Sequence, residues 1–152
     1  MSFSRNTYLE IDLENIEYII KKGETFKVEG TNIPDKVEIK QDGNTLKIND
    51  DKAFSNFYTV NNALTIYIPE NQKLNNVDIE ANSVLLDIER LNATNLKLEI
   101  YNNYCKIDEL LVDNLDMNNE YGEIEIYKSD VKTLKLDSES GTEDMHMKIT
   151  EK

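Results

Sequence analysis

Acidic side chains are the residues of this chain whose types and spacing could do chemistry. Glu80 and Glu99 are followed, at the same 19-residue spacing, by Asn118 and Asp137. Polysaccharide hydrolases and lyases need carboxylates gathered on one face, usually beside arginine or lysine. Arginines are few in this chain and its acids are spread along the whole length. We therefore expect no catalytic residues and predict that the protein is not an enzyme.

The single histidine and the single cysteine limit the other kinds of site. His146 is expected in a fraying last coil, so it offers no convincing base for a serine or cysteine nucleophile. One cysteine excludes an internal disulfide and a cysteine-based zinc site. We expect no metal and no cofactor, and we expect Cys105 to be an ordinary buried thiol.

The segment 51–62 is the one long loop that the sequence predicts, and it carries Phe54, Phe57 and Tyr58. Long loops with aromatic residues in compact domains are often binding surfaces. These three residues are therefore the candidate partner-binding residues. The alternative is that the aromatic side chains fold back and cover the first coil.

A second aromatic group, Tyr101, Tyr104 and Tyr121, is expected near the edge of one turn, where tyrosine rings could stack on sugar. The alternative is that they are ordinary exposed strand residues. Two functions stay open at this point. One is a non-catalytic interaction or scaffold module of a bacterial surface or envelope protein, and the other is a carbohydrate-binding or carbohydrate-active β-helix protein.

The net charge of −13 limits the possible partners. Thirty acidic residues outnumber seventeen basic ones, and no lysine or arginine cluster is free of acids. Phosphate backbones and anionic membranes would be repelled, so we expect no nucleic acid and no direct membrane insertion. No apolar run is long enough for a membrane span or a signal peptide. An unknown protein or glycan is the expected partner, and the sequence leaves the compartment open.

A 19-residue repeat positions most of these side chains. Apolar residues alternate with polar ones in each repeat, which is the period of a strand with one buried face. Turns are expected at Asn102-Asn103, Tyr121-Gly122 and Ser140-Gly141, since asparagine and glycine tolerate positive φ. The repeated apolar columns are these: Leu74, Ala93, Val112, Val131; Val77, Leu96, Leu115, Leu134; Ile79, Leu98, Met117, Leu136; Leu86, Cys105, Ile124, ending in Glu143; and Ile88, Ile107, Ile126, Met145.

Polar residues between the apolar ones also fall into columns. Two of these alternate in sign, as expected where neighbouring strands stack in register and opposite charges pair. A third is rich in asparagine and predicts a ladder of hydrogen bonds from coil to coil. The columns are Asp78, Lys97, Asp116, Lys135; Arg90, Glu109, Lys128; and Asn76, Asn95, Asn114, Thr133.

The predicted fold is all-β, in a single domain of residues 1–152. Residues 74–150 are expected to form about four coils of a right-handed parallel β-solenoid with 19-residue coils, since parallel crossovers are overwhelmingly right-handed. Residues 7–70 alternate without the repeat and predict an antiparallel β layer that covers the first coil. The strands expected in this layer are 8–13, 25–29, 36–39, 45–48 and 64–69.

The order of several short segments resembles the bacterial "putative adhesin" family of β-strand repeats, a domain of unknown function related to auto-transporter adhesin heads. The segments are 16–24, 26–28, 44–48 and 64–69, followed by Tyr121-Gly122-Glu123-Ile124 and Ser140-Gly141. The resemblance implies a solenoid-like domain on a cell-surface protein and implies no catalytic residue. The chain departs from the family at Val84 and Asn103, where a turn glycine is expected, and by lacking an export or anchoring segment.

Overall fold

The computed structural model describes residues 2–3, 8–13, 17–31, 37–42, 44–49, 63–70, 72–82, 85–139 and 142–149. Within these residues every regular element is a strand, and all the strands join one mixed sheet. The strands are β1 (Ser2–Phe3), β2 (Tyr8–Leu13), β3 (Glu17–Gly23), β4 (Phe26–Thr31), β5 (Glu38–Asp42), β6 (Thr45–Asn49), β7 (Ala63–Pro69), β8 (Leu74–Asn82), β9 (Leu85–Tyr101), β10 (Tyr104–Glu120), β11 (Glu123–Glu139) and β12 (Thr142–Ile149).

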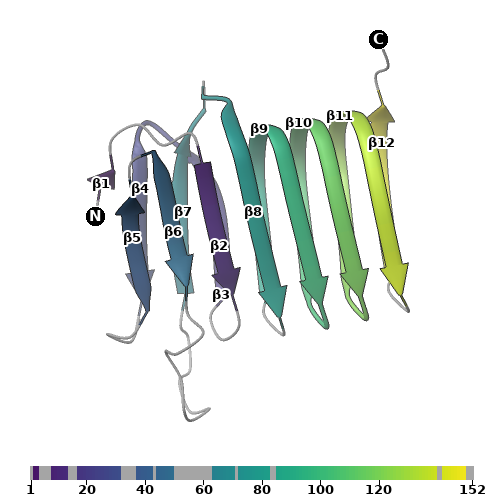
Figure 1. Cartoon of the computed structure of the whole chain (residues 1–152), viewed down its shortest axis with the longest axis horizontal. Helices are drawn as coiled ribbons and strands as arrows, with labels where there is room; N and C mark the ends of the chain where they lie inside the picture. Colours follow the sequence, from purple (N-terminus) through teal and green to yellow (C-terminus); the bar gives the residue numbers. More distant parts are fainter. Residues whose placement is uncertain are drawn as a thin grey trace.

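The sheet curls so that it forms two layers with the core between them (Figure 1). The first part of β9 pairs with β3, Leu86 opposite Tyr18, while its later part pairs with β8, Leu96 opposite Val77. Each long strand therefore runs along one layer, bends, and returns along the other. We call the layer of β5, β6, β2, β8 and the later parts of β9–β11 the front layer, as it lies in Figure 1.

Neighbouring long strands pair in parallel, each residue opposite its equivalent in the next repeat. Cys105 lies between Leu86 and Ile124 in this way. The register explains the repeat, because every inward position must meet an equivalent apolar position in the next strand. The inward columns of β8, β9 and β10 are buried as predicted, and Cys105 is fully buried among them. Burial raises the pKa of its thiol far above the ordinary value.

The expectation of an antiparallel layer over residues 7–70 is wrong for part of that segment. β2 pairs in parallel with both β6 and β8, and β3 pairs in parallel with both β7 and β9. Only β1, β4 and β5 pair antiparallel, with β4, β7 and β6 respectively. β3 is also absent from the expected strands, although Tyr18 and Ile20 alternate with more exposed residues and are fully buried. The first half therefore extends the stack.

Positive φ occurs in both described turns between long strands, at an asparagine as expected in one and at the residue before the expected glycine in the other. Asn102 and Tyr121 have φ of 47° and 59°. Gly122, which follows Tyr121, is needed because a larger residue would not fit. An added Cβ would lie 2.5 Å from Asn119 Oδ1 and 2.6 Å from Ile100 Cγ2. The buried Asn119 side chain both accepts from Gly122 N and donates to Gly122 O, at 3.0 Å each, and so closes the turn.

The polar columns lie where the sequence predicts. Asn95 Nδ2 donates to Asn76 Oδ1 at 2.9 Å, and Asn114 Nδ2 donates to Asn95 Oδ1 at 2.8 Å. Thr133 continues this ladder by donating to Asn114 Oδ1. These side-chain bonds join each coil to the next at the bend of the strands. The asparagine ladder is therefore a confirmed prediction.

Candidate functional site

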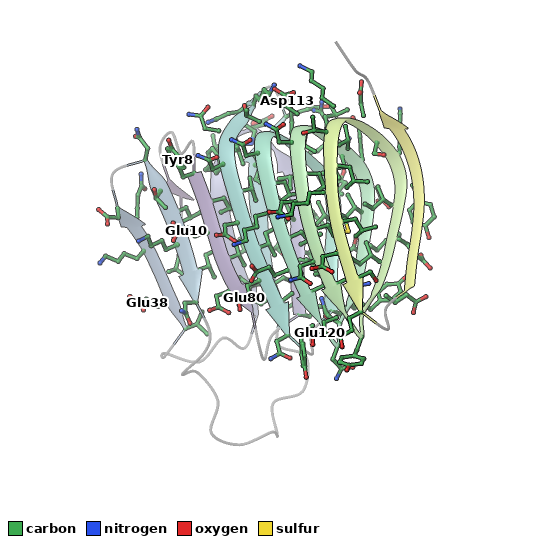
Figure 2. All side chains as sticks on the ribbon, turned by 45° about the vertical axis from the view of Figure 1, so that its right-hand side comes forward. Tyr8, Glu10, Glu38, Glu80, Asp113 and Glu120 are labelled. Carbon is green, nitrogen blue, oxygen red and sulfur yellow. The ribbon has the colours of Figure 1, made fainter. Side chains whose placement is uncertain are left out.

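A row of carboxylates crosses the outside of the front layer. It comprises, on seven neighbouring strands, Glu38, Asn49, Asp12, Glu80, Glu99, Asn118 and Asp137, each opposite the next in register. Adjacent strands are about 4.8 Å apart, so this carboxylate row packs five acids into a narrow strip. The row itself contains no lysine or arginine. The labelled Glu38 and Glu80 mark its course in Figure 2.

A mixed row of charges runs beside the carboxylate row, two positions away on each strand. It comprises Lys40, Lys47, Glu10, Asp78, Lys97, Asp116 and Lys135. Lys97 Nζ reaches Glu99 of the carboxylate row at 3.1 Å, and Lys47 Nζ lies 3.8 Å from Glu10. Burial raises the pKa of Asp78, an effect that Lys97 opposes and Glu99 and Glu10 reinforce. Negative charge therefore crowds where the two rows meet.

Shallow hollows open on this face, and two of them are larger than 300 Å³. The first, of about 380 Å³, lies between the two rows and includes Glu10, Asp12, Lys47, Asp78 and Glu80 in its lining. The second, of about 340 Å³, lies towards the turns and is lined mainly by polar side chains: Asp12, Glu80, Asn82, Glu99, Tyr101, Asn118 and Glu120. Both share Asp12 and Glu80, so the carboxylate row connects them. We call the carboxylate row and these hollows the acidic face.

Exposed tyrosines stand at the turn end of the acidic face. The Tyr101 and Tyr121 rings meet edge to face with centroids 6.1 Å apart, and the side chains are 46% and 51% exposed. Tyr101 also lines the second hollow. Tyrosine offers an apolar ring and a polar hydroxyl, which is why it is enriched at interfaces. This tyrosine pair therefore adds an aromatic contact to the edge of a carboxylate surface.

Tyr104 belongs to a different group. It lies on the layer of β4, β7, β3 and the first parts of β9–β11, which we call the back layer. Its hydroxyl donates to Glu125 at 2.9 Å, and the Tyr127 hydroxyl donates to the same carboxylate at 2.6 Å. These two bonds lower the pKa of Glu125, while its carboxylate raises the pKa of Tyr104. Lys106 lies over the Tyr127 ring at 5.7 Å. The three tyrosines grouped from the sequence are thus divided between the turn and the back layer.

The bend of the strands carries a second cluster of charges, opposite the turns. Asp113 accepts from Lys73 at 3.1 Å and lies 3.3 Å from Lys132, and these cations lower its pKa. Arg90 pairs with Glu109 at 3.1 Å, as its alternating column predicts. In Figure 2, Asp113 marks the bend in the middle of β10 and Glu120 marks the end of that strand at the turn. Lys73, Arg90 and Lys132 thus form ion pairs with acids outside the carboxylate row.

The residues predicted from the sequence meet different outcomes. Glu80 and Glu99 are brought side by side, as their spacing implied. Phe54, Phe57 and Tyr58 lie outside the described residues, and so does the side chain of His146 on β12. Sequence reasoning missed Asp12 and Glu38 as members of the row. The alternation of β2 and β5 marks both as outward residues, but no repeat gives their register.

Two general features of the described residues can be stated briefly. In the part of the chain that the structure describes, no three histidine, cysteine, aspartate or glutamate side chains are placed to hold a metal ion. No helix of sufficient length and apolarity to cross a membrane occurs among these residues.

Comparisons with known proteins place the chain in a family. The sequence matches the family described as Toastrack DUF4097 over residues 6–149. No curated protein matches it. Among solved structures, it is similar to a "putative adhesin" from Bacteroides fragilis, with 12% identity, a TM-score of 0.46, and coverage of 100% of this chain and 94% of the other. It is also similar to a "putative adhesin" from Parabacteroides distasonis, with 14% identity, a TM-score of 0.38, and coverage of 95% and 94%.

The match extends over nearly the whole chain and includes the antiparallel strands β4 and β5 as well as the 19-residue stack. It confirms the family resemblance found in the order of the segments. The chain belongs to the Toastrack DUF4097 family.

Proposed function

We propose that this domain is a non-catalytic interaction module whose acidic face binds a partner rich in lysine or arginine. The observation that carries the proposal is the carboxylate row: five acids and two asparagines in register on seven neighbouring strands, without a cation in the row, beside an exposed tyrosine. Carboxylates on a rigid sheet are already held in place before a partner arrives, so little side-chain order has to be created on binding. Complementary charge also accelerates association.

The same geometry supports binding better than catalysis. Two hollows of a few hundred Å³ lie open on a flat sheet, whereas enzyme pockets bury most of their ligand. Glu80 and Glu99 lie in neighbouring strands and Glu99 is engaged by Lys97. We propose that neither carboxylate acts as an acid, base or nucleophile, and that their shared role is to supply negative charge.

A charge-neutralised variant tests the proposal. The acidic-face variant would carry Asp12→Asn, Glu80→Gln, Glu99→Gln and Asp137→Asn. A matched control removes two aspartates and two glutamates from the back layer: Glu17→Gln, Asp87→Asn, Asp108→Asn and Glu123→Gln. The probe is a fluorescein-labelled peptide of alternating lysine and serine, with binding followed by anisotropy over a range of salt concentrations.

We expect the acidic-face variant to bind about tenfold more weakly, since four contacts of roughly 0.3–0.4 kcal/mol each are lost. The control should lose little affinity. Equal weakening in the two variants would mean that only net charge matters and that the acidic face is not a site.

Carbohydrate binding is the second candidate function, favoured by the exposed tyrosine pair. Tyr101 lines the second hollow together with the amide of Asn118 and the carboxylate of Glu120, and its ring meets that of Tyr121. A glycan array probed with wild type and with Tyr101→Ala separates the two functions. Binding to neutral glycans that Tyr101→Ala removes and high salt leaves intact would favour the sugar.

Three finer statements are part of the same proposal. The 19-residue coils wind in a right-handed sense, supported by the general handedness of parallel crossovers. The module works at a cell surface, as the family resemblance suggests. Phe54, Phe57 and Tyr58 stay predicted partner-binding residues, and alanine variants of each belong in the same anisotropy assay.

A further inference from the structure

Tyr121 occupies a backbone position that disfavours tyrosine. Its φ of 59° lies in the left-handed region, where a Cβ crowds the backbone and a bulky residue is an outlier. The equivalent residue one coil earlier is Asn102, with φ of 47°, and asparagine tolerates this conformation better. The turn geometry therefore favours asparagine or glycine at position 121 over the tyrosine that is present. Residues held in such conformations are concentrated at ligand-binding sites.

The Tyr121 side chain does not offset this strain by filling the core. It is 51% exposed, and Tyr101, whose ring it meets edge to face, is 46% exposed. The two ring planes stand at 89° to each other, with the centroids 6.1 Å apart. The pair therefore forms an open aromatic corner at the turn, and about half of each side chain is left for contact with a third group.

A carboxylate lies beside this aromatic corner. Glu120 directly precedes Tyr121 and lies opposite Tyr101 in register, on the next strand. It lines the second hollow together with Tyr101 and Glu99, and Figure 2 labels it at the turn end of β10. Among the residues that the structure describes, Glu120 takes part in no ion pair, whereas Glu99 is engaged by Lys97. Glu120 is therefore the acid beside the rings whose charge a partner can neutralise.

An aromatic corner beside a carboxylate matches the chemistry of a guanidinium group. Guanidinium is planar, so it stacks on an aromatic face and still directs paired N–H groups at a carboxylate. A lysine ammonium is a compact, strongly hydrated charge without a planar surface, so it gains less from the rings. A neutral sugar would gain the ring contact but no charge attraction to Glu120. The combination of rings and charge therefore favours arginine.

We propose that Tyr101, Tyr121 and Glu120 form an arginine-selective subsite at the turn end of the acidic face. The guanidinium group of an arginine in the partner lies against the tyrosine rings and pairs with the Glu120 carboxylate. The proposal rests on the proposed function, because it names which of the two cationic side chains the acidic face selects. The carboxylate row attracts lysine and arginine alike, and the subsite distinguishes between them.

Two peptides that differ only in their cation test this selection. One is the fluorescein-labelled peptide of alternating lysine and serine, and the other has arginine at every lysine position. The ratio of their dissociation constants would be measured by anisotropy for wild type, Tyr101→Leu, Tyr121→Asn and Glu120→Gln. Tyr127→Leu is the matched control, because Tyr127 is a tyrosine of similar exposure, 49%, on the back layer.

We expect wild type to bind the arginine peptide about two- to fivefold tighter than the lysine peptide, the range for an exposed cation–π contact. Tyr101→Leu and Tyr121→Asn should bring the ratio close to one and leave binding of the lysine peptide nearly unchanged. Glu120→Gln should also reduce the ratio, because the guanidinium loses its paired acceptor. Tyr127→Leu should leave the ratio as in wild type.

The stability of Tyr121→Asn separates selection from a structural role of the tyrosine. Asparagine fits positive φ better, so the urea midpoint of this variant should equal or exceed that of wild type. A lower midpoint would mean that Tyr121 is kept for packing, and it would overturn the proposal. So would a ratio near one in wild type, or a ratio that the tyrosine variants leave unchanged.

The same assay distinguishes failure of the subsite from failure of the proposed function. The acidic-face variant should weaken binding of both peptides and keep their ratio, because it retains Glu120 and both tyrosines. Equal weakening by that variant and by its back-layer control would contradict the proposed function, whereas the ratio reports on the subsite alone. Binding of neutral glycans that Tyr101→Leu removes would assign the tyrosine pair to a sugar and overturn the arginine subsite.

Discussion

Gly122→Ala should be the most damaging single-methyl addition at a turn of this protein. The new Cβ would lie 2.5 Å from Asn119 Oδ1 and 2.6 Å from Ile100 Cγ2, distances at which something must move. Ile100 is buried and β-branched, so it has few other rotamers. Asn119 can move only by giving up its two hydrogen bonds to Gly122 in a buried place.

The magnitude follows from those two bonds. A buried polar group left without its partner costs about 1–3 kcal/mol. Loss of one or both bonds to Asn119 therefore predicts a destabilisation of about 1–6 kcal/mol, a large part of the roughly 5–15 kcal/mol that holds a domain folded. Urea denaturation followed by circular dichroism would measure the free energy of unfolding.

The equivalent position one coil earlier provides the control. Asn103 already has a Cβ there, and the residue that corresponds to Ile100 one coil earlier is the smaller Ala81. Its buried side-chain amide has no hydrogen bond partner. Asn103→Ala should therefore be neutral or mildly stabilising. If Gly122→Ala changes the free energy of unfolding by less than about 0.5 kcal/mol, below the range for a lost buried partner, the turn is not close-packed and this reasoning fails.

Three further predictions rest on the stack. Lys97→Glu should destabilise by up to about 1 kcal/mol by placing three acids in a row, and adding Asp78→Lys and Asp116→Lys should recover most of that in urea melts. Leu98→Asp should leave the domain unfolded, because a buried unpaired carboxylate costs several kcal/mol. A cooperative thermal transition near the melting temperature of wild type would contradict this prediction. Lys73 lowers the pKa of Asp113, so the ionised carboxylate stabilises the fold above the unfolded-state pKa, and this stabilisation is lost as the pH falls through the lower folded-state pKa. Asp113→Asn should therefore reduce the change of the urea midpoint with pH over that acidic range. Identical pH profiles for the variant and wild type would argue against the pairing.

The repeat made half of the fold predictable. In the parallel pairing each inward residue lies opposite its equivalent in the next coil. The same positions must therefore be apolar in every coil, and the sequence repeats with a period of 19 residues. Leu98 between Ile79 and Met117 is an example. The asparagine ladder and the alternating charges follow for the same reason. Such columns give register directly, because a shift of one residue would turn every side chain to the wrong face.

The first half lacks that information, and the errors fall there. Leu9 lies opposite Val77, which is far away along the chain, and no spacing in the sequence marks the pair. Alternation shows that Leu9 is inward and Asp12 outward, but it does not say whether β2 meets its neighbours in parallel or antiparallel. The carboxylate row was therefore visible only from Glu80 to Asp137, and its extension over β2 and β5 needed the structure.

The two ends of the stack differ in a way that bears on function. At the N-terminal end, β1, β4 and β5 run antiparallel to their partners, although Glu38 and Lys40 on β5 still continue the two charged rows in register. At the C-terminal end, Leu134, Lys135 and Leu136 continue the columns, and β10 is the strand that pairs with them among the described residues. A sheet edge left open is a liability that proteins usually cover or blunt. The antiparallel strands β4 and β5 therefore change the strand direction at one end of the stack, whereas β11 keeps the direction and the register of the repeat at the other.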